Sequence, residues 1–117
     1  MEQRIYDLRE MEHFSDSPQK VAIYETDKTL AVMWCLEPEQ EVFLHTHPNA
    51  DDVWIILEGE GLYSQGNGET AEINKSMAVL AKAGQVHGMR NIGCGRFVFV
   101  GVAAPVPIEI HRMQHDS

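Results

Sequence analysis

Short β-rich runs separated by turn residues recur from residue 20 onward, and their spacing constrains the fold more than any other feature. The connections carry residues typical of tight turns, such as Gly66-Asn67-Gly68 and Gly93-Cys94-Gly95. Many short strands at close and regular spacing predict an all-β antiparallel sandwich or barrel. The expected strands are residues 20–25, 29–36, 41–47, 52–58, 61–65, 70–73, 77–82, 86–89 and 96–103, with 107–110 as an optional last strand.

Helical patterns are weak in this chain. The best stretch, residues 6–14, is polar and closely followed by two serines, so we expect a short helix or turn there at most. A length of 117 residues with 44% hydrophobic content predicts one globular domain over residues 1–117. Residues 112–117 are expected to form a tail, and His111 and His115 are expected to be exposed to solvent.

Charge and cysteine content narrow the partners and the compartment. The formal net charge of −9 disfavours nucleic acid and anionic membrane surfaces as partners. No apolar run approaches the roughly 18 residues that span a bilayer, and the first residues lack the pattern of a signal peptide. Cys35 and Cys94 do not make a disulfide framework, so we expect a cytoplasmic protein with reduced thiols.

Residue types that bind metals cluster in the middle of the chain. His45-Thr46-His47 lies on an expected strand, where alternation puts both imidazoles on one face. The turn at residues 48–51 brings Asp52 to the start of the next strand, beside the histidines, and His87 follows later. Three imidazoles and one carboxylate suit a divalent transition metal ion. The predicted metal ligands are therefore His45, His47, Asp52 and His87.

Two alternatives stay open at this point. His45 and His47 could be hydrogen-bonded histidines of a barrel that holds no metal. Asp51 could replace Asp52 as the carboxylate ligand, although strand alternation faces Asp51 away if Asp52 faces inward.

Residues 45–61 (HTHPNADDVWIILEGEG) resemble the first motif of the cupin superfamily, in which HxH is followed by a glutamate and then a glycine. Residues 82–91 (KAGQVHGMRN) resemble its second motif, PxGxxHxxxN, with Gly84, His87 and Asn91 in register. The resemblance covers about residues 29–103, with the motifs over about 39–61 and 76–91. It implies a small single-domain cupin with a double-stranded β-helix or jelly-roll barrel. It also implies one bound ion of Fe, Mn, Ni or Zn.

The sequence departs from these motifs at four positions. Asp52 stands where the family usually carries glutamate; it is one methylene shorter, so the strand or ion must shift by about 1 Å to keep a bond near 2.1 Å. Glu39 and Ser76 stand where the motifs usually begin with glycine, and Lys82 replaces the usual proline. The last three departures concern turn geometry rather than metal coordination.

Strand alternation also predicts a ligand cavity next to the metal ligands. Phe43 shares a face with His45 and His47, Trp54 shares one with Asp52, and Met89 follows His87 by two residues. The predicted substrate-binding residues are Phe43, Trp54 and Met89. Such an aromatic, apolar lining suits a small, partly apolar molecule that reaches the ion through a pair of oxygens. The alternative is that these three side chains only fill the barrel.

The opposite face of two strands is also apolar. Val53, Ile55 and Leu57 point away from the expected cavity, and residues 97–100 are apolar on both faces. A strand that is apolar on both faces is buried on both, and a partner subunit is an economical cover. We therefore expect a homodimer packed sheet to sheet, with cover by the N-terminal segment as the competing explanation.

The resemblance to cupins implies a metal-dependent enzyme of the dioxygenase, decarboxylase or isomerase type, and we expect it to act on a small oxygen-rich metabolite. Residues 45–52 (HTHPNADD) also resemble the HxHPN stretch of oxalate decarboxylases and germins, which favours small carboxylates and Mn(II). The alternative is a non-catalytic module that binds or senses a sugar or carboxylate. Arg90 and Lys82 could clamp a carboxylate, although a solvated surface position is expected for both.

Overall fold

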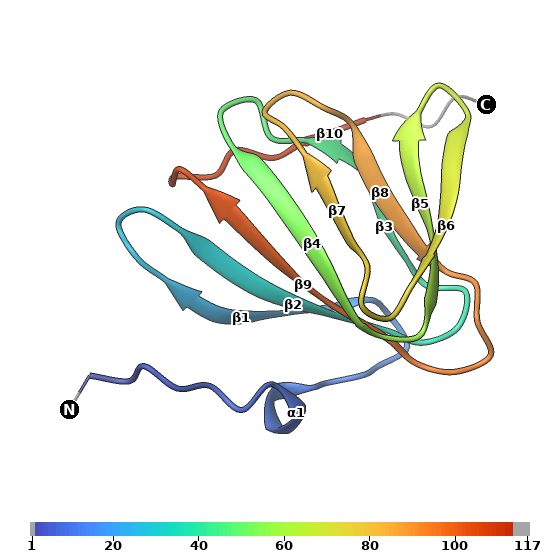
Figure 1. Ribbon diagram of the computed structural model, residues 1–117, viewed down its shortest axis with the longest axis horizontal. Coiled ribbons are helices and arrows are strands. Elements are labelled where there is room, and N and C mark those ends of the chain that lie inside the picture. The colour runs from blue at the N-terminus through green and yellow to red at the C-terminus, as the bar shows by residue number, and fades with distance from the viewer. Residues whose placement is uncertain (1, 114–117) are drawn as a thin grey trace.

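The computed structural model describes residues 2–113, and these form strands almost throughout (Figure 1). One short helix, α1 (Leu8–Met11), precedes the strands and lies within the stretch where a short helix was predicted. The strands are β1 (Gln19–Glu25), β2 (Leu30–Leu36), β3 (Glu41–Thr46), β4 (Asp51–Glu58), β5 (Glu60–Gly66), β6 (Glu69–Asn74), β7 (Ala78–Ala81), β8 (His87–Asn91), β9 (Phe97–Ala104) and β10 (His111–Arg112).

The strands form two five-stranded antiparallel sheets that pack face to face. Sheet A has the order β1-β2-β9-β4-β7, and sheet B has the order β10-β3-β8-β5-β6. Most neighbours within each sheet are distant in sequence, so the chain crosses repeatedly between the two layers (Figure 1). This arrangement is a double-stranded β-helix, and the all-β jelly-roll prediction is confirmed.

The hydrophobic core lies between the sheets and follows strand alternation. On β4, Trp54 and Ile56 point inward with 2% and 1% of their surface exposed, whereas Ile55 between them is 42% exposed. Aromatic rings from β4 and β9 fill the centre of this core, with the Trp54 and Phe99 ring centroids 4.8 Å apart. The core therefore occupies one part of the sandwich interior.

The outer face of sheet A carries a second hydrophobic cluster. Met33 and Val98 are fully buried there, and the residues packed against the cluster include Leu8, Met11 and Phe14 of the N-terminal segment. The segment that includes α1 runs along this side of the molecule, below β1 and β2 in Figure 1. The competing explanation for the apolar outer face, cover by the chain's own N-terminal segment, thus holds for this part of the sheet. The homodimer stays a prediction.

The C-terminal region differs from expectation in one respect. Residues 107–110 do not form a strand, and the last strand is β10, where His111 pairs with Thr46 and Arg112 with His45. Arg112, the first residue of the expected tail, therefore belongs to sheet B. His111 is exposed, as predicted, and His115 lies outside the described residues.

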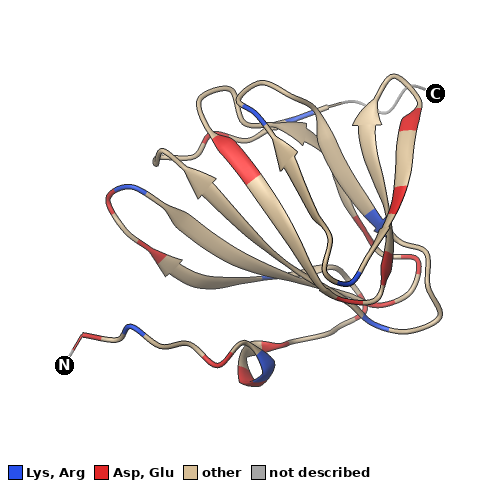
Figure 2. Ribbon diagram, in the orientation of Figure 1, with Lys and Arg blue, Asp and Glu red and all other residues tan. Residues whose placement is uncertain are grey.

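Charged residues concentrate near strand ends and connections (Figure 2). The central strands β2 and β9 of sheet A carry no Lys, Arg, Asp or Glu, because both of their faces are covered. Within residues 2–113, no helix has the length and apolar character needed to cross a membrane. The location of the protein in the cell stays a prediction.

Candidate metal centre

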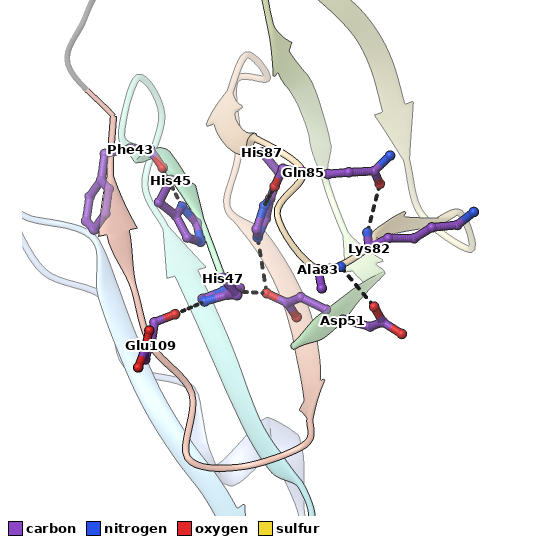
Figure 3. A network of polar contacts seen from close by, with 10 residues as sticks. Phe43, His45, His47, Asp51, Lys82, Ala83, Gln85, His87 and Glu109 are labelled. Carbon is purple, nitrogen blue, oxygen red and sulfur yellow. Dashed lines mark hydrogen bonds and ion pairs between the residues drawn. The ribbon is translucent and has the colours of Figure 1, made fainter. Parts of the chain in front are cut away.

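The four predicted metal ligands converge at one point between the sheets, and Figure 3 labels the three histidines among them. His45 lies on β3, His47 follows directly after it, and His87 begins β8, so sheet B supplies all three imidazoles. Asp52 comes from β4 in sheet A. One donor atom from each residue lies within 4.8 Å of the others, and all four residues are buried.

Local backbone pairing explains why these residues meet. The antiparallel register of β3 and β8 puts His45 directly opposite His87. The Gly84 N–H donates to the His47 carbonyl over 2.9 Å, which ties the loop before β8 to the end of β3. The pairing of β3 with β8 is irregular between Val42 and His45, so strict alternation is interrupted there. Val42 therefore faces the interior as His45 does.

Each histidine is oriented by a backbone carbonyl at its Nδ1 atom. His45 Nδ1 lies 2.8 Å from the Phe43 carbonyl oxygen, His87 Nδ1 lies 3.2 Å from that of Gln85, and His47 Nδ1 lies 2.8 Å from that of Glu109. A carbonyl can only accept, so each Nδ1 carries the proton and donates it. In a neutral imidazole this leaves the Nε2 lone pair free, which is the arrangement typical of metal-binding histidines.

Asp52 faces two of these Nε2 atoms. Its Oδ2 atom lies 3.2 Å from His47 Nε2 and 3.3 Å from His87 Nε2. A neutral imidazole that donates from Nδ1 cannot also donate from Nε2, so lone pairs would face the carboxylate oxygen. The contacts become favourable only when a proton or a metal ion lies between them. The donor set therefore fits a cation.

The pKa values respond to burial and to this carboxylate. Burial lowers the pKa of His45 from 6.5 to about 4 and keeps that imidazole neutral. Burial also acts to lower the pKa of His47, but hydrogen bonds to Asp52 and to the Glu109 carbonyl outweigh it, and the pKa is raised. Burial acts to raise the pKa of Asp52, and the two histidine contacts outweigh it and lower the pKa. Asp52 is therefore a carboxylate at neutral pH.

Asp51 points away from the cluster. Its Oδ1 atom accepts a hydrogen bond from the Ala83 N–H over 2.9 Å, and the residue is exposed (Figure 3).

The structure also explains why lysine can stand at residue 82, where the family motif usually has proline. The Lys82 N–H donates to the Gln85 side-chain oxygen over 2.8 Å, a hydrogen bond that proline could not make. This departure concerns the loop, as expected.

A cavity of about 210 Å³ opens beside the cluster and is mostly apolar. Phe43 and Trp54 line it, as the sequence predicted. Met89 differs from its prediction. Among residues 2–113, those that line this cavity do not include Met89, which is 2% exposed and packs in the hydrophobic core. Strand parity placed Met89 inward, but depth along the strand puts it in the packed part of the interior.

Several cavity residues were missed by the sequence reasoning. Trp34, Ile108 and Lys20 line the cavity from elements outside the motifs, and their local sequence gave no indication of it. Gly101 also lines it, and a Cβ atom there would lie 2.9 Å from the Trp54 ring. A glycine inside the apolar run of β9 often marks such a close approach, so this residue could have been identified.

A connecting segment, residues 105–110, closes one side of the site. Asn49 holds it at two points: the side-chain amide donates to the Pro107 carbonyl over 2.8 Å, and its oxygen accepts from the Glu109 N–H at 3.4 Å. The same segment supplies the carbonyl that orients His47. Asn49 therefore positions a backbone group that acts on a candidate ligand.

The fold and the buried three-histidine, one-carboxylate cluster define a β-helix protein with a candidate metal centre. Residues 32–102 match the family model described as the cupin domain, and the chain belongs to this family. No protein with a curated description matches the chain.

Solved structures support the same assignment. The chain is 35% identical to an "uncharacterized conserved protein with double-stranded beta-helix domain" from Klebsiella pneumoniae, with 97% of this chain and 100% of that chain covered and a TM-score of 0.93. It is 30% identical to the protein TT1209 from Thermus thermophilus, with 90% and 100% covered and a TM-score of 0.83. A predicted oxalate decarboxylase from Thermotoga maritima shares the fold at 20% identity, with 77% and 93% covered and a TM-score of 0.68.

Proposed function

We propose that this cupin is a metal-dependent enzyme that acts on a small, oxygen-rich metabolite. The observation that carries the proposal is the orientation of the donors. Three buried imidazoles donate from Nδ1 to backbone carbonyls, and two of their Nε2 atoms lie within 3.3 Å of the Asp52 carboxylate. Such a set is complete only when a cation joins it.

His45, His47, Asp52 and His87 would hold the ion. When bound, a divalent transition metal supplies Lewis-acid chemistry, or redox chemistry if it is Fe or Mn. Four protein donors are fewer than the six that an octahedral ion takes, which leaves room for substrate oxygens. The apolar walls around Trp54 make the surroundings of this point less polar, which strengthens electrostatic contacts there.

The cavity limits the size of the substrate. Its volume of about 210 Å³ lies below the roughly 300–1,000 Å³ that is typical of ligand pockets. A small compound with a pair of oxygens fits this space. The resemblance of residues 45–52 to the HxHPN stretch of oxalate decarboxylases favours a small carboxylate.

A non-catalytic binding or sensor module is the second candidate. Apart from the clustered residues, the described lining of the cavity offers Lys20 as its one titratable side chain. A reaction that needs a separate general acid or base near the metal would have to use solvent, the ligands or this lysine. Tight binding of a metabolite without turnover would favour the sensor.

Elemental analysis of protein purified without an affinity tag or chelator tests the metal centre. We expect about one equivalent of Fe, Mn, Ni or Zn in the wild type and none in the His45→Ala/His47→Ala variant. His111→Ala is the matched control, because His111 is exposed and outside the cluster. Full metal occupancy in the double variant, or no metal in the wild type after anaerobic reconstitution, would contradict the proposal.

We also propose that the protein forms a homodimer through the outer face of β4 and β7. Ile55 is 42% exposed and Leu80 is 56% exposed, and Leu80 pairs with Val53 across these strands. The N-terminal segment covers a different part of sheet A, so this apolar area supports contact with a second copy. Ile55→Asp should give a monomer by sedimentation, and an unchanged mass would count against the sheet-to-sheet dimer.

A further inference from the structure

A single lysine stands where the cavity meets its outer groove. Lys20, on the edge strand β1, lines the cavity beside His45, His47 and Asp52. It also lines a second, shallower hollow that continues outward over Trp34 and Phe43. A molecule that enters the cavity from this groove therefore passes the lysine.

The lysine is supported by an aromatic wall rather than by an acid. Its Nζ atom lies 5.6 Å from the Trp34 ring centroid, and Lys20 is paired with Trp34 across β1 and β2. Among residues 2–113, no ion pair is formed by Lys20. The ammonium therefore shares the cavity with the cluster and remains open to a ligand.

The charged residues that line the groove are two cations and two carboxylates. Arg112 adds a second cation, with its guanidinium carbon 4.4 Å from the Phe43 ring centroid. Glu39 and Glu41 also line the groove, but Glu39 is engaged by Arg90. The groove is thus balanced in charge, in a protein whose net charge is −9, and Lys20 is its cation next to the cluster.

We propose that Lys20 anchors an anionic group of the substrate, which is a small carboxylate with an apolar or aromatic body. The body packs against Trp34 and the neighbouring apolar walls, and a pair of oxygens at its other end faces the histidine cluster. This inference rests on the proposed function, because it assigns the two ends of one ligand. Lys20 replaces Arg90 and Lys82 as the candidate residue that binds the carboxylate. Arg90 pairs with Glu39, and the cavity lining includes neither Arg90 nor Lys82.

Two small probes separate the anchor from the metal centre. Catechol and 3,4-dihydroxybenzoate share the same ring and oxygen pair, and the second adds a carboxylate on the far side. Titration calorimetry of each probe is carried out anaerobically with the zinc-loaded protein, because zinc does not oxidise catechols. The readout is the ratio of the two affinities, compared between variants so that the intrinsic difference between the probes cancels.

We expect Lys20→Met to reduce the preference for 3,4-dihydroxybenzoate by about fivefold to tenfold, which is less than a buried charge-assisted contact contributes because Lys20 is exposed. Lys20→Arg should keep the preference, and so should Lys75→Met, a control lysine in the turn between β6 and β7. Zinc content and thermal unfolding verify that each variant is folded and loaded. An unchanged ratio in Lys20→Met would overturn the anchor alone. Failure of both probes to bind the zinc-loaded wild type would overturn the open metal centre, and the anchor with it.

Discussion

The three clustered histidines are held in two different ways. His45 and His87 each donate to the carbonyl that lies two residues earlier on the chain, at Phe43 and Gln85. His47 instead donates to Glu109, which lies 62 residues later. Two of the imidazoles are thus oriented by their own local backbone, and the third is oriented by a segment that must first dock beside it.

This difference shows which part of the centre depends on the whole fold. A local hydrogen bond forms as soon as the strand takes its extended shape, so His45 and His87 are oriented by sheet B itself. The His47 contact requires residues 105–110 to lie across the site, where Asn49 holds them. We infer that metal affinity is most open to adjustment through His47, by changes outside the ligand set.

The largest expected loss of metal affinity comes from removing the Asp52 carboxylate, which faces one histidine of each group. Asp52 contacts the remotely held His47 and the locally held His87, so Asp52→Ala should weaken metal binding by at least about 100-fold. Competition with a chromophoric chelator measures this affinity. Asp51→Ala is the neighbouring control, because its side chain bonds Ala83 instead.

Asp52→Glu restores the residue that is usual in the family, and we expect it to retain the metal. Wild-type affinity in Asp52→Ala, or a large loss in Asp51→Ala, would show that the carboxylate assignment is wrong.

Removing the hydrogen bonds that hold residues 105–110 beside His47 should have a smaller effect on metal affinity. Asn49→Ala removes both hydrogen bonds to residues 105–110 and should lower metal affinity by about tenfold, the usual effect of losing a group that orients a ligand. Asn49→Asp should lie between, because it can accept from the Glu109 N–H but cannot donate to the Pro107 carbonyl. Equal affinities in all three proteins would mean that His47 is oriented without this clamp.

The pH dependence of the metal-free protein distinguishes the two histidines further. The folded pKa of His45 is about 4, below its ordinary 6.5, so the unfolded chain binds the proton first and stability falls as pH drops below 6.5. The folded pKa of His47 is raised, so its contribution is fully present below 6.5 and is lost as pH rises through the raised value. The two histidines therefore act with opposite sign.

Urea unfolding with chelator present, from pH 5 to pH 8, measures these contributions. Relative to the wild type, His45→Ala should lose less stability as the pH falls toward 5. His47→Ala should lose less as the pH rises toward 8. Parallel pH profiles for the wild type and both variants would refute the assignment of opposite signs.

The same division between local and remote features explains what the sequence could predict. Strand positions, the shared face of His45 and His47, and the inward position of Asp52 follow from period-two alternation, which is a local property. The contacts of Asn49 with Glu109 and the place of Lys20 in the cavity join elements that are distant in sequence. No local pattern encodes such contacts, since they depend on how the sheets pack.

Met89 shows a second limit of predictions made from strand alternation. Parity gives the face of a strand correctly, and Met89 is indeed buried, but parity carries no information on depth along the strand. The cavity lies at one end of the sandwich interior and the packed core at the other, so two inward residues can have different neighbours. Substrate contacts predicted from parity alone therefore need the register of the partner strands.

The smallest expected effect concerns the departure from the cupin motif at Ser76, which affects only the local turn. Ser76, where the second motif usually begins with glycine, has φ of 76°, a left-handed conformation that is costly for a residue with a Cβ atom. Ser76→Gly should raise the free energy of unfolding by about 0.5–1 kcal/mol, measured by urea titration, because glycine adopts this φ without strain. Metal affinity should not change, because the departure affects the turn and not the ligands.

Ser64→Gly on β5 is the control with the opposite expectation. Serine is replaced there in ordinary strand backbone, so glycine should lower stability by about 0.5–1 kcal/mol through its greater freedom in the unfolded chain. If both variants lose stability equally, the left-handed backbone at Ser76 carries no cost in the native protein. If their effects differ in sign, the turn before β7 is a strained local feature that this cupin tolerates beside a metal centre it leaves untouched.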